Sequence, residues 1–121
     1  MMNTSITKSF FFEAAHQLKN HNGKCANLHG HSYRFDVTVV GSLITNGSSE
    51  GMVIDFADLS KKVNDEIVDK WDHHFLNDLV TFPTTAELLA QEIFNKLKDS
   101  GLNVIKICLW ETAKSYATVQ E

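Results

Sequence analysis

Residues 29–43 read HGHSYRFDVTVVGSL, and their alternation of apolar and polar side chains decides the fold. The apolar side chains share one parity: Tyr33, Phe35, Val37, Val39 and Leu43. A period of two residues is that of a β-strand with one buried face. The upstream stretch, residues 6–16, has the same pattern, and its single-parity residues are Ile6, Phe10, Phe12, Ala14 and His16. The two stretches predict a long antiparallel hairpin joined by the polar loop 18–27.

Two helical stretches follow the hairpin. Asp55 is a suitable N-cap for a helix with one apolar stripe, formed by Phe56, Leu59, Val63, Ile67 and Trp71. The capping-box pair Thr84 and Glu87 opens a second helix with its own stripe, formed by Ala86, Leu89, Ile93 and Leu97, and Gly101 closes it. Strands are expected again at 104–110 and 115–119. The order β-β-α-α-β-β predicts an α+β fold: a four-stranded antiparallel sheet with two helices on one face.

Length and composition narrow the function classes. A chain of 121 residues suits one compact domain, spanning 1–121. A net charge of -4 and a single arginine, Arg34, argue against nucleic acid as a partner. We expect no membrane partner and a cytoplasmic location, because no run approaches the ~20 apolar residues of a membrane span. Cys25 and Cys108 do not suggest a disulfide framework, and Cys108 is expected in the core.

The two open edges of such a sheet would leave backbone groups unpaired. Edge strands of this kind are a liability that other chains commonly cover. We therefore expect a homo-oligomer.

Three histidines are candidate metal ligands. His29 and His31 are two residues apart on a strand, so their imidazoles point to the same face. His16 is in phase with the apolar face of the neighbouring strand, and the hairpin can bring it to the other two. Three imidazoles with an open fourth position describe a catalytic zinc site. The alternative is that each histidine is merely hydrogen-bonded and partly buried, since short metal motifs also arise by chance.

Other residues could support acid–base chemistry. Cys25, in the loop, is either a thiolate base or nucleophile or an ordinary free cysteine. Asp72 with one of the two histidines His73 and His74 could form a carboxylate–imidazole pair for proton transfer. The alternative is a histidine that interacts favourably with the macrodipole at a helix end. Glu111 continues the parity of the apolar run 104–110, so it lies at a solvated strand end or points into a pocket.

The motifs, taken in order, resemble the 6-pyruvoyltetrahydropterin synthase family. They are most similar to its bacterial 6-carboxytetrahydropterin synthase branch. The matching segments extend over essentially the whole chain: FEAAH at 12–16, CANLHGH at 25–31, VIDF at 53–56, DHHFLND at 72–78, PTTAE at 83–87 and ET at 111–112.

The resemblance implies a tunnelling fold, in which the sheets of several subunits join around a ring. It implies a homohexamer of two stacked trimers with active sites between subunits. For the site it implies these roles: zinc ligands His16, His29 and His31; proton acceptor Cys25; relay pair Asp72 and His73; pterin anchor Glu111; and pterin contacts Thr84 and Thr85. The two threonines are also adequately explained as helix caps.

The implied reaction is zinc-dependent conversion of 7,8-dihydroneopterin triphosphate to 6-carboxy-5,6,7,8-tetrahydropterin. Acetaldehyde and triphosphate are released, and the enzyme is a carbon–oxygen lyase of queuosine biosynthesis. Two alternatives remain open: a synthase that stops at 6-pyruvoyltetrahydropterin, and a zinc- and pterin-binding module without catalysis. A further branch of the family has glutamate in place of the cysteine, and Cys25 argues against that branch.

Overall fold

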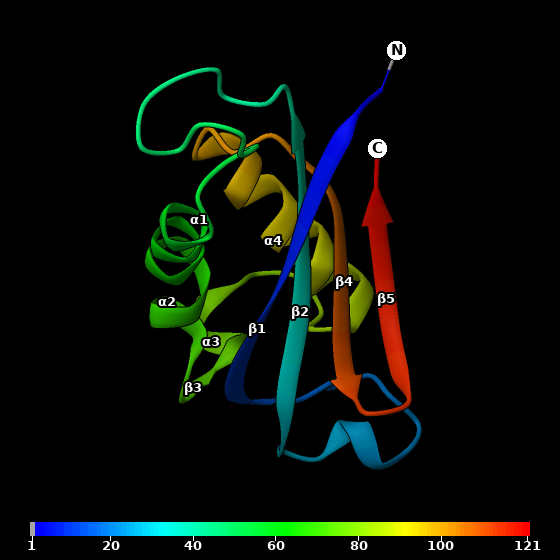
Figure 1. Cartoon of the computed structure of the whole chain (residues 1–121). Coiled ribbons are helices and arrows are strands. Elements are labelled where there is room, and N and C mark those ends of the chain that lie inside the picture. Colours follow the sequence, from blue (N-terminus) through cyan, green and yellow to red (C-terminus); the bar gives the residue numbers. More distant parts are fainter. Residues whose placement is uncertain (1) are drawn as a thin grey trace.

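The computed structural model describes residues 2–121 and is organised around one long hairpin (Figure 1). Strand β1 (Thr4–His16) pairs antiparallel with β2 (His29–Gly41), and the register runs without a break from Thr4 opposite Gly41 to His16 opposite His29. The predicted apolar parity is confirmed, because its aromatic residues are buried along both strands. Leu43 is the exception: β2 ends at Gly41, and the Leu43 side chain is 49% exposed.

The hairpin forms the centre of a five-stranded sheet. Strand β4 (Val104–Thr112) pairs antiparallel with β2, and β5 (Ser115–Gln120) pairs antiparallel with β4, as predicted. The prediction of four strands is one short, because β3 (His74–Phe75) adds in parallel to β1 beside Ala14 and Ala15. A two-residue strand is too short to leave a periodic pattern in the sequence.

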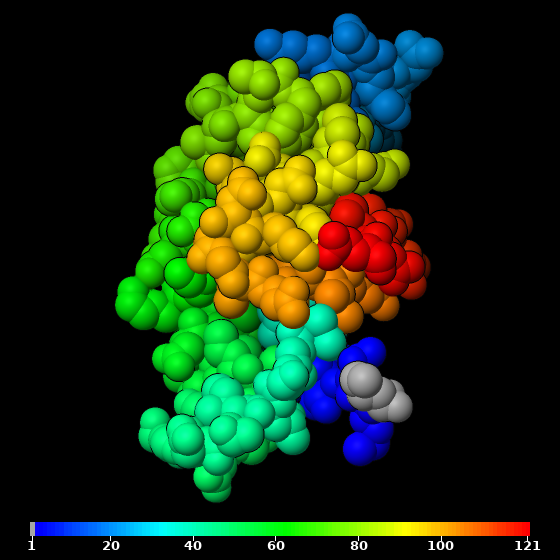
Figure 2. Space-filling view, turned by 90° about the horizontal axis from the view of Figure 1, so that it is seen from above, coloured from blue at the N-terminus to red at the C-terminus, as the bar shows by residue number. Residues whose placement is uncertain are grey.

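The helices cover one face of this sheet, so the predicted α+β class is correct (Figure 1). The first predicted helix is a continuous helical segment made of α1 (Phe56–Val63), the π-helical η2 (Asn64–Val68) and α2 (Asp69–Trp71). The short helix α3 (Leu76–Leu79) follows β3, and α4 (Ala86–Asp99) is the second predicted helix. Figure 2 shows α4, in yellow and orange, lying against β5 in red.

Local capping fixes where the helices begin. Asp55 accepts a hydrogen bond from the Ala57 N–H at 2.7 Å, as predicted for an N-cap. At α4 the cap is Thr85, which accepts from the Leu88 N–H at 3.2 Å, and not Thr84. The capping-box prediction is therefore one residue early, because Thr84 is fully buried and makes other contacts. Gly101 ends the helical region in the left-handed conformation, with φ of 102°.

Aromatic rings fill the core between the hairpin and the helices. The Phe12 ring stacks on Tyr33 at a centroid distance of 4.8 Å and meets the Trp71 ring edge-on at 5.7 Å. Two predicted core residues lie elsewhere. Phe56 is 50% exposed at the start of α1, and Cys108 is half-buried on the opposite face of the sheet, with its Sγ 3.5 Å from the Thr118 hydroxyl.

Within residues 2–121, no helix is long and apolar enough to cross a membrane.

Phe11 and Phe12 test the strand parity as a matched pair. Phe12→Ala is expected to lower the free energy of unfolding by about 3–5 kcal/mol, because it removes a buried ring and leaves a cavity. Phe11 is 64% exposed, so Phe11→Ala should change that free energy by no more than about 0.5 kcal/mol. Urea denaturation of both variants measures the difference, and equal losses would contradict the observed register.

Candidate metal centre

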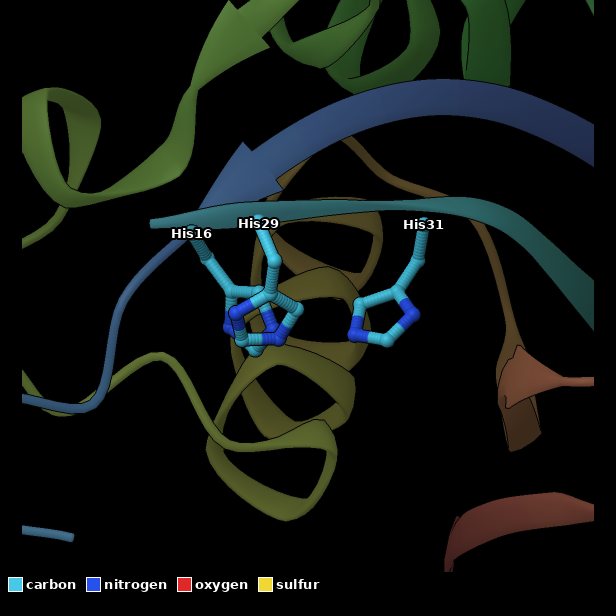
Figure 3. Close-up of side chains that lie close together, drawn as sticks. All are labelled: His16, His29 and His31. Carbon is cyan, nitrogen blue, oxygen red and sulfur yellow. The ribbon is translucent and has the colours of Figure 1, made fainter. Parts of the chain in front are cut away.

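His16, His29 and His31 project from the ends of β1 and β2 into one small space (Figure 3). Their ligand nitrogens all lie within 4.8 Å of one another. The hairpin register causes this convergence, since it places His16 directly opposite His29 and leaves His31 one pleat further along the same face. The predicted grouping of the three histidines is therefore present in the structure.

The His16 ring is fixed by the segment that precedes α4. Its Nδ1–H donates to the Thr84 carbonyl at 2.9 Å, so the neutral ring presents the Nε2 lone pair to the cluster. Burial lowers the pKa of His16, which keeps the imidazole neutral. His16 Nε2 is buried and has no hydrogen-bond partner among the described residues. A buried, unsatisfied lone pair of this kind fits a metal ligand.

The other two imidazoles complete a similar arrangement. His29 Nδ1–H donates to the Asn27 carbonyl at 2.7 Å, which leaves its Nε2 as an acceptor. His31 Nε2 is buried and unpartnered in the part of the chain that the structure describes, and burial lowers the pKa of His31. Neutral imidazoles are the form that coordinates a divalent ion. The three nitrogens can hold one zinc ion and leave a fourth position open.

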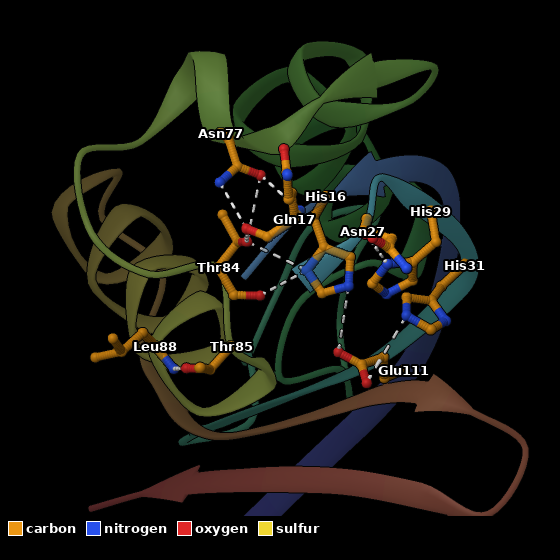
Figure 4. A network of polar contacts seen from close by, with 10 residues as sticks. All are labelled: His16, Gln17, Asn27, His29, His31, Asn77, Thr84, Thr85, Leu88 and Glu111. Atoms are coloured by element: carbon orange, nitrogen blue, oxygen red, sulfur yellow. Dashed lines mark hydrogen bonds and ion pairs between the residues drawn. The ribbon is translucent and has the colours of Figure 1, made fainter. Parts of the chain in front are cut away.

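Glu111 borders the same space, which decides between the two sequence interpretations of this carboxylate (Figure 4). Its Oε2 lies 3.9 Å from His16 Nε2, and its Oε1 lies 3.8 Å from His31 Nε2. The pairing of β4 with β5 shifts register between Trp110 and Thr112, so Glu111 is the residue at an irregularity of the ladder. Bulges of this kind redirect a side chain, and here the carboxylate adds negative charge beside the imidazoles.

Cys25 lies outside this cluster. It is half-buried in the 3-10 turn η1 (Lys24–Ala26), within the loop that joins β1 to β2. Among the described side chains, the group that can hold an ion comprises the three histidines without the thiol. Cys25 is thus available for a role other than metal binding.

Asp72 and His73 form the predicted carboxylate–imidazole pair. Asp72 Oδ2 lies 2.9 Å from His73 Nδ1, and Asp72 Oδ1 accepts the Glu13 N–H at 2.8 Å. That backbone hydrogen bond and the His73 side chain lower the pKa of Asp72. His73 has φ of 61°, a left-handed conformation that is costly for a non-glycine residue and is often found at functional sites.

This pair lies at the edge of β1, where both residues hydrogen-bond to the backbone of Glu13. His73 borders an open hollow lined by the outward-facing Glu13, Ala15, Gly30 and Ser32 of β1 and β2, together with Ala14 and His31. Successive side chains of a strand point to opposite faces. Within one chain, the structure therefore does not bring the Asp72–His73 pair to the cluster.

The two threonines occupy different environments. Thr84 is fully buried against His16, with its hydroxyl 3.2 Å from His16 Nδ1, and the Thr85 hydroxyl caps α4. Sequence reasoning gave no role to Gln17 and Asn77, which hydrogen-bond to each other beside His16 (Figure 4). The sequence did contain a signal that could have identified them. Gln17 directly follows a candidate ligand, and both residues are polar and adjacent to an apolar residue.

Comparisons with known proteins agree with this geometry. A family model described as 6-pyruvoyl tetrahydropterin synthase matches residues 5–121. The chain belongs to this family. The match spans both strands of the hairpin, all the helices and the C-terminal strands, so the resemblance inferred from the sequence is confirmed. The chain is accordingly a member of a family of pterin synthases, as predicted.

Individual relatives support the same assignment. The chain is 41% identical to the 6-carboxy-5,6,7,8-tetrahydropterin synthase of Haemophilus influenzae, over 96% of this chain and 98% of that protein. It is 46% identical to the protein of the same name from Synechocystis, over 80% of this chain and 77% of that protein. The structure of Caenorhabditis elegans 6-pyruvoyl tetrahydropterin synthase superposes with a TM-score of 0.84 at 30% identity, covering 100% of this chain and 97% of that one.

The metal-free protein is expected to lose stability as the pH falls below 6.5, the ordinary histidine pKa. Folding lowers the pKa of His16 and His31, so below pH 6.5 the unfolded chain binds more protons than the folded one. The loss continues until the pH reaches the folded-state pKa values and then levels off. Thermal unfolding of the chelator-treated protein from about pH 8 to about pH 5 measures it. His16→Asn should flatten the dependence, and a Tm independent of pH in the wild type would contradict the burial argument.

Proposed function

We propose that this protein is a 6-carboxy-5,6,7,8-tetrahydropterin synthase that acts on 7,8-dihydroneopterin triphosphate and serves queuosine biosynthesis. The observation that carries the proposal is the convergence of three imidazoles with Glu111 at one end of the sheet. The printed names of the relatives that are 41% and 46% identical support the choice of product within the family.

The proposed cofactor is zinc, held by His16, His29 and His31. When bound, it supplies Lewis-acid polarisation of the hydroxyl groups on the substrate side chain. The hydrogen bonds to the Thr84 and Asn27 carbonyls fix two of the three rings, so little reorganisation is needed for binding.

Glu111 is proposed to anchor the pterin ring. A carboxylate can accept two parallel N–H bonds from the guanidine-like edge of a pterin, which fixes the ring in its plane. Glu111 is 25% exposed and lines a hollow of about 350 Å³ together with Ala86, Glu87 and Tyr116, so one side of the carboxylate is open to a ligand. Thr84 and Thr85, at the start of α4, are proposed to be the pterin contacts that the resemblance implies.

Cys25 and the Asp72–His73 pair are proposed to move the protons. The Cys25 thiolate accepts a proton from the substrate side chain, and His73, oriented by Asp72, exchanges a proton with the reacting groups. The side chain then loses triphosphate. A water molecule next adds to the carbon attached to the ring, the bond from that carbon to the rest of the side chain breaks, and acetaldehyde leaves the 6-carboxy product behind.

The active site is proposed to form between subunits of a homohexamer built from two stacked trimers. Two structural features support this assembly. The Asp72–His73 pair is bonded to the edge of β1 and not to the histidine cluster of the same chain, so we infer that a site that uses both groups draws them from two subunits. In addition, among residues 2–121 β5 pairs with β4 alone, and β3 covers just the end of β1, so both sheet edges offer backbone groups to a neighbour.

A 6-pyruvoyltetrahydropterin synthase is the second candidate, favoured by the structural match to the Caenorhabditis elegans protein of that name. Both reactions begin with loss of triphosphate. They differ in that only the first candidate releases acetaldehyde.

Incubation of the zinc-loaded protein with 7,8-dihydroneopterin triphosphate is expected to yield 6-carboxytetrahydropterin and acetaldehyde, identified by mass. His29→Ala should lose nearly all activity and most bound zinc while it keeps the wild-type circular dichroism spectrum, because His29 is at a strand end outside the core. Triphosphate without acetaldehyde would select the second candidate. No conversion by the fully loaded wild type would refute both, and an unfolded His29→Ala variant would instead indicate a structural ion.

Hybrid oligomers test the sharing of the site between subunits. Cys25→Ala and Asp72→Asn are each expected to be inactive, because each removes one proton-transfer group. When the two variants are dissociated, mixed in equal amounts and reassembled, about a quarter of the sites should combine an intact Cys25 with an intact Asp72 from the neighbour. The hybrid should therefore recover about a quarter of the wild-type rate. A mixture as inactive as the separate variants would show that one subunit supplies both groups.

A further inference from the structure

Asn77 holds the backbone of the residue that follows His16 (Figure 4). Its Nδ2 donates to the Gln17 carbonyl at 2.9 Å, and its Oδ1 accepts the Gln17 N–H at 2.9 Å. One side-chain amide thus satisfies both backbone groups of Gln17, as a neighbouring strand would. The chain leaves β1 at this point, so the clamp fixes the direction in which it continues.

The clamped segment in turn holds the loop that contains Cys25. The Gln17 side chain donates from Nε2 to the Ala26 carbonyl at 2.8 Å. The Leu18 N–H donates to the carbonyl of Cys25 itself at 2.7 Å. The carbonyls of Cys25 and of the next residue are therefore both tied to the two residues that follow His16.

The other hydrogen bonds of the loop either stay within it or, in the case of the Asn27 carbonyl, come from His29. The turn η1 contains no buried residue and has no side-chain cap among its own residues. A half-buried thiol on such a turn takes its position from backbone hydrogen bonds and not from core packing.

We infer that Asn77 and Gln17 are positioning residues that hold the Cys25 loop at a fixed place relative to His16. The inference rests on the proposed function for the part played by Cys25 in proton transfer. Chemistry between a thiolate and a substrate bound at the histidine cluster needs a fixed separation, and a displacement of ~1 Å can cost ~10²-fold in rate.

Gln17 and Asn77 contact different groups, so we expect their variants to have different defects. Gln17 reaches the loop with its side chain, and Gln17→Met removes that donor while it keeps the length and the clamped backbone. Asn77 contacts the backbone beside His16, and Asn77→Asp replaces the Nδ2 donor with an oxygen that repels the Gln17 carbonyl. The first variant should disturb the loop alone, whereas the second should disturb both the loop and His16.

The test compares three measurements in a Cys108→Ser background, which leaves Cys25 as the one thiol of the chain. They are the rate at which iodoacetamide alkylates Cys25, zinc affinity by competition with a chromophoric chelator, and kcat and KM. Gln17→Met is expected to lower kcat by ~10²-fold and to alkylate ~10-fold faster, with zinc affinity within ~2-fold of wild type. Asn77→Asp should also lower zinc affinity by ~10–100-fold.

Asn22→Asp is the matched control, because it makes the same chemical change at an exposed position of the same loop and should leave all three measurements unchanged. Gln17→Met with the wild-type alkylation rate would overturn the inference, as would a loss of zinc affinity equal to that of Asn77→Asp. If the wild type makes no product, the proposed function fails, but alkylation and zinc affinity still decide whether the clamp exists. If Asn77→Asp does not fold, Gln17→Met decides the matter alone.

Discussion

The register of β1 against β2 is the constraint on which the rest of the structure depends. A shift by one residue would turn every side chain of a strand to the other face, so the aromatic core and the histidine cluster can form only together. The stack of Phe12 on Tyr33 and the pairing of His16 with His29 are consequences of the same ladder. Burial of the aromatic rings therefore stabilises the arrangement of the candidate ligands. The three histidines continue the row of inward-facing side chains of β1 and β2 to the end of the hairpin.

The position of the cluster at this end also sets its electrostatics. His16 is buried enough for desolvation to keep it neutral, yet the cluster is close enough to the surface for Glu111 to remain one-quarter exposed beside it. A buried neutral imidazole with an unsatisfied nitrogen is costly for a protein that has nothing to bind, since the lone pair forfeits its hydrogen bond to water. Two such nitrogens in one cluster, on His16 and His31, indicate that the fold carries this cost for a ligand.

Sequence reasoning was strong where a repeating pattern met one buried face. Alternation along the hairpin predicted both long strands and brought His29 and His31 to one side, and the helical stripe that ends at Trp71 was equally clear. Sequence reasoning was weak where a single contact decides the local structure. The strand β3 depends on the left-handed turn at His73, the cap of α4 moved to Thr85 because Thr84 packs on His16, and Cys108 is in an apolar run but on the open face. None of these contacts leaves a repeating pattern of apolar and polar residues in the sequence.

The placement of Asp72 and His73 extends the argument from the chain to the assembly. The Asp72 carboxylate accepts the Glu13 N–H and the His73 N–H donates to the Glu13 carbonyl, so the pair is anchored to the edge of β1 and not to the histidine cluster. Within one chain, Asp72 and His73 bond to each other and to Glu13, and not to the cluster. If both belong to one reaction, the neighbour's pair must approach each cluster from outside. Burial at a subunit boundary would then exclude water from the reacting groups, which the open hollow beside His73 in the single chain does not do.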